Sequence, residues 1–187
     1  SRINENTDIK EAAFTVLGSI ALHGLRLSET TLGSKVVVIG LGVIGQLVCR
    51  LAEAQGSEVT GIDPDPERSK YGDNFFSSAN DVELKDVDTV IITAATSSNE
   101  PIELATKIAR NKAKIVVVGD IPLNISRNDF YYKELELVVS KSYGPGRYDK
   151  QYEALGNDYP IEYVRWTENR NFEAFTKLLS QKQIHLL

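Results

Sequence analysis

The stretch Lys35–Asp63, KVVVIGLGVIGQLVCRLAEAQGSEVTGID, limits the possible folds of this chain more than any other. It begins with an apolar run and continues through Gly40, Gly42 and Gly45, which have the spacing G-x-G-x-x-G. An amphipathic segment and a second apolar run follow, and the stretch ends at Asp63. This order of strand, glycine-rich turn, helix and strand predicts a βαβ unit that binds a dinucleotide.

The three glycines have different physical roles in such a unit. Gly40 lets the first strand turn sharply, Gly42 lets backbone approach a pyrophosphate, and Gly45 lets the helix start pack close to the strand. The helix N-terminus then offers unpaired N–H groups and about half a positive charge to the phosphates. Two alternatives remain open. One is a glycine-rich turn that binds nothing, and the other is a methyltransferase, whose ligand has no pyrophosphate and for which Gly45 is less expected.

The acid at the end of the second apolar run indicates which dinucleotide is preferred. Asp63 lies 18 residues after Gly45, where a carboxylate can accept hydrogen bonds from the adenosine ribose. The same charge repels the 2′-phosphate of NADP, and Asp65 and Glu67 add to it. We therefore expect NAD as the cofactor, with NADP less favoured. Arg68 either reaches the ribose from the following helix or points to solvent.

Strand and helix patterns alternate along the rest of the chain. This alternation predicts an α/β fold of the Rossmann type: a doubly wound, parallel, six-stranded sheet with helices on both faces, in one domain spanning 1–187. We expect strands at 36–39, 59–62, 74–76, 88–93, 114–118 and 136–140. We expect helices at 9–27, 43–55, 66–70, 101–110 and 171–181, with 8–32 as a lead-in linker helix and 142–187 as an ordered loop and C-terminal helix.

Ligands of doubly wound sheets bind beyond the carboxyl ends of the strands. That rule selects the loops 40–45, 63–68, 93–97 and 119–122. Thr93 and Ala94 carry no bulky side chain that would block a ribose or a nicotinamide, and Gly119 begins the last of these loops. An ordinary strand-end loop is the alternative for 93–97.

Composition excludes several classes of protein. The net charge is −5 with basic residues scattered along the chain, so we expect no nucleic-acid partner. No apolar run approaches the roughly 18 residues of a membrane span, and no signal peptide is visible. Cys49 is the single cysteine and cannot form an internal disulfide, which favours a reducing, cytoplasmic setting. It fits a buried core position. With only two histidines, one of them His23 in a surface or packing role, the chain alone cannot build a zinc site of Cys and His ligands.

Two further segments carry expectations. The apolar sixth strand, 135–139, is expected at a sheet edge, where it invites pairing with a second copy in a homodimer. Residues 142–166 are rich in tyrosine, proline and glycine, and they read either as a functional loop or as a flap that covers the sheet edge. The chain also begins at Ser1 and contains no methionine, so we expect a piece of a longer protein.

From Glu11 onward the sequence resembles the cofactor-binding domain of a medium-chain dehydrogenase/reductase, of the zinc-type alcohol dehydrogenase superfamily. The resemblance rests on AAFTVLGSIALHGLR, on the glycine-rich stretch, and on the strands up to VVVGD. Its second half, with GPGRYD and YVRWTENRN, is similar to the branch called bi-domain oxidoreductases. Such enzymes transfer a hydride between a nicotinamide cofactor and a small alcohol or sugar substrate.

The resemblance implies roles for residues at matching positions. It places Gly40, Gly42, Val43, Ile44 and Gly45 at the pyrophosphate, Asp63 and Arg68 at the adenosine ribose, and Thr93, Ala94 and Gly119 on the nicotinamide side. The catalytic domain of such enzymes is absent from this chain, so no catalytic residue and no metal ligand is assigned. We expect the isolated chain to bind NAD(H) and to catalyse nothing. A non-enzymatic NAD-binding sensor or regulatory domain is the alternative.

Overall fold

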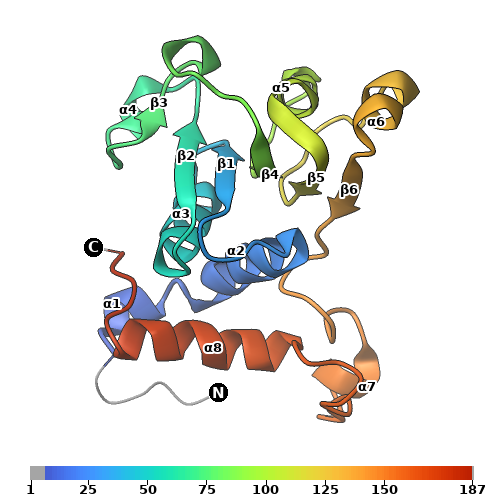
Figure 1. Ribbon diagram of the computed structural model, residues 1–187. Helices are drawn as coiled ribbons and strands as arrows, with labels where there is room; N and C mark the ends of the chain where they lie inside the picture. Colours follow the sequence, from blue (N-terminus) through green and yellow to red (C-terminus); the bar gives the residue numbers. More distant parts are fainter. Residues whose placement is uncertain (1–6, 187) are drawn as a thin grey trace.

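Six parallel strands form one sheet in the order β3-β2-β1-β4-β5-β6 (Figure 1). The computed structural model describes residues 7–186. The direction of winding reverses between β1 and β4, as in doubly wound dinucleotide-binding folds. The predicted fold class is therefore confirmed. The strands are β1 (Lys35–Ile39), β2 (Glu58–Ile62), β3 (Phe75–Phe76), β4 (Val87–Ile92), β5 (Ala109–Val117) and β6 (Glu136–Val139).

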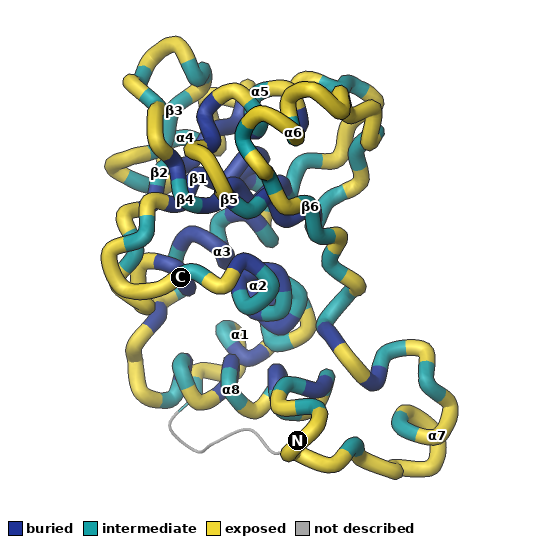
Figure 2. The backbone as a smooth tube through the Cα atoms, turned by 45° about the vertical axis from the view of Figure 1, so that its right-hand side comes forward, coloured by how far each residue is buried: buried dark blue, intermediate teal, exposed yellow. Residues whose placement is uncertain are grey.

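Helices cover both faces of the sheet because the central strands are apolar on both sides. In β1, Val36 and Val38 join a core with α2 (Thr15–Ser28), α3 (Val43–Ala54) and α8 (Glu168–Ser180). The alternate residues Val37 and Ile39 join a second core against α5 (Glu100–Ile108). In Figure 2 the central strands and much of α2 are coloured as buried, whereas β3, β6 and the α7 region are exposed or intermediate.

The lead-in helix is not continuous, which corrects the prediction of one helix over 9–27. The structure has α1 (Ile9–Ala12), a break at Ala13 and Phe14, and then α2. The Thr15 hydroxyl donates to the Ala12 carbonyl at 2.6 Å and so competes for an acceptor that a continuous helix would use.

Other boundaries differ more modestly. The fifth strand begins at Ala109, directly after α5, so 109–110 are strand and not helix. The last helix starts at Glu168, three residues before the predicted start. The short helix α4 (Pro66–Ser69) lies where the sequence predicted it, at 66–70. Three further short helices were not predicted: the 3₁₀ helix Ala79–Asp81, α6 (Arg127–Lys133) and α7 (Lys150–Glu153). Their length is close to one or two turns, which is too short to show an apolar period.

The segment after β6 leaves the sheet, passes through α7 and returns as α8, which lies beneath α2 (Figure 1). Gly18 of α2 makes room for the Phe175 ring of α8, since a Cβ at Gly18 would lie 2.1 Å from that ring. Asn171 is fully buried; it donates to the Tyr143 carbonyl at 2.9 Å and accepts from Arg26 at 2.7 Å. These contacts tie α2, the loop and α8 together.

Candidate functional site

A cleft of about 540 Å³ lies beyond the carboxyl ends of β1, β2 and β4. Its position is the one that the topology of a doubly wound sheet assigns to a ligand. Six of the ten predicted cofactor residues line it: Gly40, Gly42, Asp63, Arg68, Thr93 and Ala94. We call it the strand-end cleft. Val43, Ile44, Gly45 and Gly119 do not line it directly.

The three motif glycines meet different surroundings. Gly40 has a φ of +98°, and a Cβ there would lie 2.6 Å from the Ala94 nitrogen. A Cβ at Gly45 would lie 1.9 Å from the Gly40 carbonyl oxygen, so this glycine is required by the packing of helix against loop. A Cβ at Gly42 would meet no heavy atom within 4 Å. Protein packing therefore explains Gly40 and Gly45, and it leaves the space beside Gly42 open.

Gly42 is also the N-cap of α3. It has no side chain that could cap the helix, so the N–H groups of the first turn, which includes Val43 and Ile44, have no side-chain acceptor from that position. Such a turn carries partial positive charge and binds phosphate groups. The start of α3 at the cleft thus suits a pyrophosphate.

Asp63 connects the cleft to the glycine-rich loop. The side chain is 3% exposed, and its Oδ2 accepts from the Leu41 N–H at 2.7 Å and from Arg68 at 3.2 Å. Its Oδ1 accepts from the Asp65 N–H at 2.9 Å. Each carboxylate oxygen has about two acceptor positions, so Oδ1 retains one for a ligand hydroxyl.

Arg68 lies at the cleft as well. Its guanidinium forms ion pairs with Asp63 at 3.2 Å and with Asp65 at 3.4 Å. The side chain is half exposed, so it remains reachable from the cleft while these two acids hold it.

Small residues hold the other loops against the glycine turn. The Thr93 hydroxyl donates to the Gly40 carbonyl at 2.5 Å. A Cβ at Gly119 would lie 2.0 Å from the Ala94 carbonyl oxygen. The loops after β1, β4 and β5 are therefore packed directly on one another. Gly119 contributes to the site by this packing, behind Ala94.

The sequence did not indicate the outer wall of the cleft. That wall includes residues of the segment after β3 and of the start of α5: Ser77, Ser78, Ala79, Glu100, Pro101 and Leu104. Residues 77–79 reach the cleft because β3, which precedes them, pairs with β2 in the sheet. A strand of two residues gives too little pattern to reveal this from sequence.

The remaining candidate residues have clear positions. Cys49 is completely buried in the α3 core, and burial raises the pKa of its thiol, which agrees with the predicted core role. His23 does not lie in the strand-end cleft; it lines a separate cavity. Burial, and then the charge of Arg26, lower the pKa of His23 below its ordinary value.

Within residues 7–186, no three side chains of His, Cys, Asp or Glu gather in a group that could hold a metal ion. Over the same residues, none of the helices combines the length and apolar character needed to cross a membrane.

The strand order, the glycine-rich turn at α3 and the acid after β2 are those of a Rossmann-type dinucleotide-binding fold, and the chain is similar to alcohol and polyol dehydrogenases of the medium-chain type. Known proteins agree. The chain is 29% identical over 178 residues to 2-dehydro-3-deoxy-L-galactonate 5-dehydrogenase of Pseudoalteromonas atlantica. That match covers 87% of this chain and 49% of the relative, so the chain spans about half the length of the enzyme that it resembles.

Solved structures share the fold. A "putative zinc-binding dehydrogenase" of Sinorhizobium meliloti 1021, bound to NADP, matches with a TM-score of 0.73 at 20% identity, over 98% of this chain and 52% of that one. A protein named short chain alcohol dehydrogenase from Escherichia coli CFT073, complexed with NADH, matches with a TM-score of 0.75 at 18% identity, over 99% and 52%.

A family model also matches the central part of the chain. Residues 25–120, just over half of the chain, match the model of DUF364, which is described as "Putative heavy-metal chelation", and the chain belongs to this family. The match includes β1, α3, β2 and β4, which are the elements that form the strand-end cleft.

Proposed function

We propose that this chain is the NAD(H)-binding part of a dehydrogenase that acts on a small alcohol, polyol or sugar derivative. The observation that carries the proposal is the strand-end cleft. There the space beside Gly42, at the start of α3, is open, and Asp63 Oδ1 has an acceptor position that no protein donor uses. The sugar-acid dehydrogenase relative and the nicotinamide-bound structural relatives support the reaction class.

In this proposal the chain binds and orients the cofactor. The N–H groups at Gly42, Val43, Ile44 and Gly45 hold the pyrophosphate, and Asp63 accepts from the adenosine ribose. Thr93, Ala94 and Gly119 form the small-residue surface on the nicotinamide side. When bound, the nicotinamide supplies the hydride chemistry, and the protein supplies orientation and electrostatics.

The preference for NAD over NADP rests on charge. A 2′-phosphate would enter beside the Asp63 carboxylate, and Arg68, the nearest cation, is already paired with Asp63 and Asp65. The relatives include one protein bound to NADP and one bound to NADH, so their contents do not decide the preference.

Calorimetric titration with NADH, NADPH and adenosylmethionine tests the proposal. We expect NADH to bind, NADPH to bind at least about tenfold more weakly, which corresponds to about 1.4 kcal/mol, and adenosylmethionine not to bind. The variant Asp63→Asn removes the charge and keeps an acceptor, so the preference should shrink. Asp129→Asn, on exposed α6, is the matched control. Tighter binding of NADPH than of NADH by the native chain would overturn the preference.

We further propose that the chain alone turns over no alcohol or sugar. The support is that it spans about half of its relative. Mixing the chain with NAD and a panel of polyols, and following NADH by absorbance, should give no rate above the protein-free control. Measurable turnover would show that the chain contains a complete active site. NADH binding without turnover, even with a full-length gene product, would favour the non-enzymatic sensor.

A further inference from the structure

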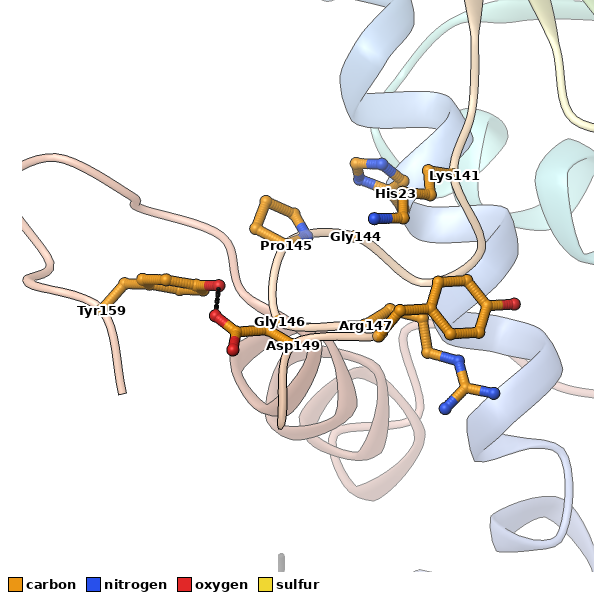
Figure 3. Close-up of a pocket in the computed structure, with 9 residues that line it drawn as sticks. His23, Lys141, Gly144, Pro145, Gly146, Arg147, Asp149 and Tyr159 are labelled. Atoms are coloured by element: carbon orange, nitrogen blue, oxygen red, sulfur yellow. Dashed lines mark hydrogen bonds between the residues drawn. The ribbon is translucent and has the colours of Figure 1, made fainter. Parts of the chain in front are cut away.

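A second cavity, of about 320 Å³, lies between α2 and the segment that follows β6 (Figure 3). His23 of α2 and Lys141, just after β6, line it together with 144–149 and Tyr159. We call it the His23 pocket. Its volume is at the low end of the roughly 300–1,000 Å³ typical of ligand sites, which suits one small molecule and not a dinucleotide.

The His23 pocket lies on the ligand-binding edge of the sheet. Lys141 follows the carboxyl end of β6, and β6 is parallel to β5. On the α2 side, a Cβ at Gly24 would lie 2.6 Å from the side chain of Val118, the residue directly after β5. The pocket is thus beyond the carboxyl ends of β5 and β6, and the strand-end cleft is beyond those of β1, β2 and β4.

Two nitrogen groups on one side of the pocket have no hydrogen-bonding or ionic partner among residues 7–186. Lys141 is exposed; its amine has no carboxylate within 4 Å and lies 5.4 Å from the centroid of the Tyr148 ring. The His23 imidazole is half-buried and, because its pKa is lowered by burial and by Arg26, it is neutral at neutral pH. Figure 3 shows these two side chains next to each other.

The opposite side of the pocket presents oxygen groups. The Tyr159 hydroxyl donates to Asp149 Oδ2, and Asp149 Oδ1 accepts from the Gln151 N–H at 2.9 Å. Figure 3 shows this pair across Pro145 from His23 and Lys141. The remaining acceptor positions of Asp149 can take hydroxyl protons, and the half-exposed Tyr rings offer a face to C–H groups.

Arg147 does not add a free charge to the pocket. Its guanidinium is turned away from His23 and Lys141 (Figure 3). It pairs with Glu153 at 2.5 Å. The pocket therefore combines one unpaired cation, one neutral imidazole, one carboxylate and phenolic groups. A simple anion would make no use of the acceptor positions of Asp149, and a neutral polyol would make no use of the charge of Lys141. A chain of hydroxyls that ends in an anionic group satisfies both sides.

We propose that the His23 pocket binds a polyhydroxylated small molecule with one anionic end, with the anion at Lys141 and His23 and the hydroxyls at Asp149 and Tyr159. The shared chemistry is that of sugar acids and sugar phosphates. This inference goes beyond the proposed function, because the His23 pocket shares no lining residue with the strand-end cleft. Binding itself does not depend on the cofactor.

The two histidines of the chain provide a direct readout. His23 lies in the pocket, whereas His185 follows α8 at the opposite end of that helix from the loop (Figure 1). In NMR spectra of imidazole-labelled protein, we expect D-gluconate or D-glucose 6-phosphate to shift the His23 signals in a saturable manner and to leave the His185 signals in place. The two probes separate a carboxylate from a phosphate terminus. D-glucitol and acetate, which carry the hydroxyls and the charge separately, should bind at least tenfold more weakly.

Lys141→Met removes the charge and keeps most of the stem. We expect it to weaken the anionic probe at least tenfold and to leave D-glucitol unchanged. Lys150→Met, an exposed lysine on α7 that does not line the pocket, is the control and should bind as the native chain does.

The proposal is overturned if neither sugar anion shifts His23, if acetate binds as tightly as gluconate, or if Lys141→Met binds the anions like the native chain. NADH titrated into the same samples keeps the two proposals apart. NADH binding without sugar-anion binding rejects only the His23 pocket, and sugar-anion binding without NADH binding rejects only the cofactor role.

Discussion

Gly42 and Gly45 occupy one sequence motif, yet the structure gives them opposite reasons to be glycine. Gly45 is enclosed, because a Cβ would lie 1.9 Å from the Gly40 carbonyl oxygen and 2.7 Å from Thr93 Oγ1. Gly42 is open on the protein side and has an ordinary φ of −63°. Gly45 serves the fold, and Gly42 serves the proposed cofactor.

This difference predicts separable effects of adding one methyl group. Gly45→Ala should lower the free energy of unfolding by about 1–3 kcal/mol, the usual cost of overpacking, because the nearest atom is a backbone carbonyl oxygen that cannot rotate away. Gly42→Ala should change stability by less than about 1 kcal/mol and should weaken NADH binding at least tenfold. Urea denaturation and calorimetry of both variants provide the measurements. A Gly45→Ala protein as stable as the native chain would contradict this prediction, because it would show that the loop at Gly40 can move to admit the methyl group.

The lowered pKa of His23 predicts a pH dependence of stability. Above the ordinary pKa of about 6.5 the imidazole is neutral in the folded and unfolded states, so it contributes no slope. As pH falls below that value, the unfolded state takes up the proton first, and the folded state loses stability until pH reaches the folded pKa. His23→Gln should flatten this part of a plot of unfolding free energy against pH. His185→Gln is the control, and equal slopes for native and His23→Gln proteins would contradict the assignment.

At the scale of elements, the sequence predicted the parts with a strong pattern. The apolar runs of β1, β4 and β5 and the glycine-rich turn were found because buried parallel strands are continuous in apolar character. The break at Ala13 and Phe14 and the short α6 were not, because they depend on single hydrogen bonds and on partners elsewhere in the chain. The strand-end cleft was predicted from topology, whereas its outer wall and the His23 pocket required the tertiary structure.

Lys133 of α6 makes a contact of this kind with the end of α5. Its amine donates to the carbonyls of Thr106, Lys107 and Ala109, at 2.7, 3.0 and 2.8 Å, and so caps the end of α5. Lys133→Met should lower the unfolding free energy by about 1–2 kcal/mol, because the helix end loses a charged donor. Lys177→Met, exposed on α8, should change it by less than about 0.5 kcal/mol. Thermal denaturation of the two variants tests this prediction, and equal melting temperatures for Lys133→Met and Lys177→Met would exclude the capping role.

The sixth strand lies at the edge of the sheet, as predicted, with Val139 59% exposed. We propose that this edge pairs two copies of the chain. Val139→Lys should shift the mass from light scattering toward the monomer, since a charged edge residue opposes strand pairing. Lys141→Met serves as a control close in sequence. A native chain that is monomeric at high concentration would remove the proposal.

For the whole molecule, α2 and α3 cover one face of the sheet, and α8 packs on the outer side of α2. Phe175 is fully buried in the space that Gly18 leaves. Phe175→Ala should lower the unfolding free energy by about 3–5 kcal/mol through loss of apolar contact and a remaining cavity. Tyr163→Ala, at 82% exposure, should have little effect. If tryptophan fluorescence from Trp166 and circular dichroism report separate transitions for Phe175→Ala, α8 detaches before the sheet unfolds.

The pairing of Gly18 with Phe175 also has a consequence for synthesis on the ribosome. The two residues are separated by 157 positions in the chain, so α2 is translated long before its partner α8. At typical elongation rates of about 5–20 residues per second, the apolar face of α2 waits for roughly 8–30 s. During this time the sheet can assemble while one of its covering layers is still unfinished. The nascent chain therefore presents an exposed apolar surface on α2 until α8 emerges. The fraction of nascent chains bound by chaperones should fall only when α8 has left the exit tunnel.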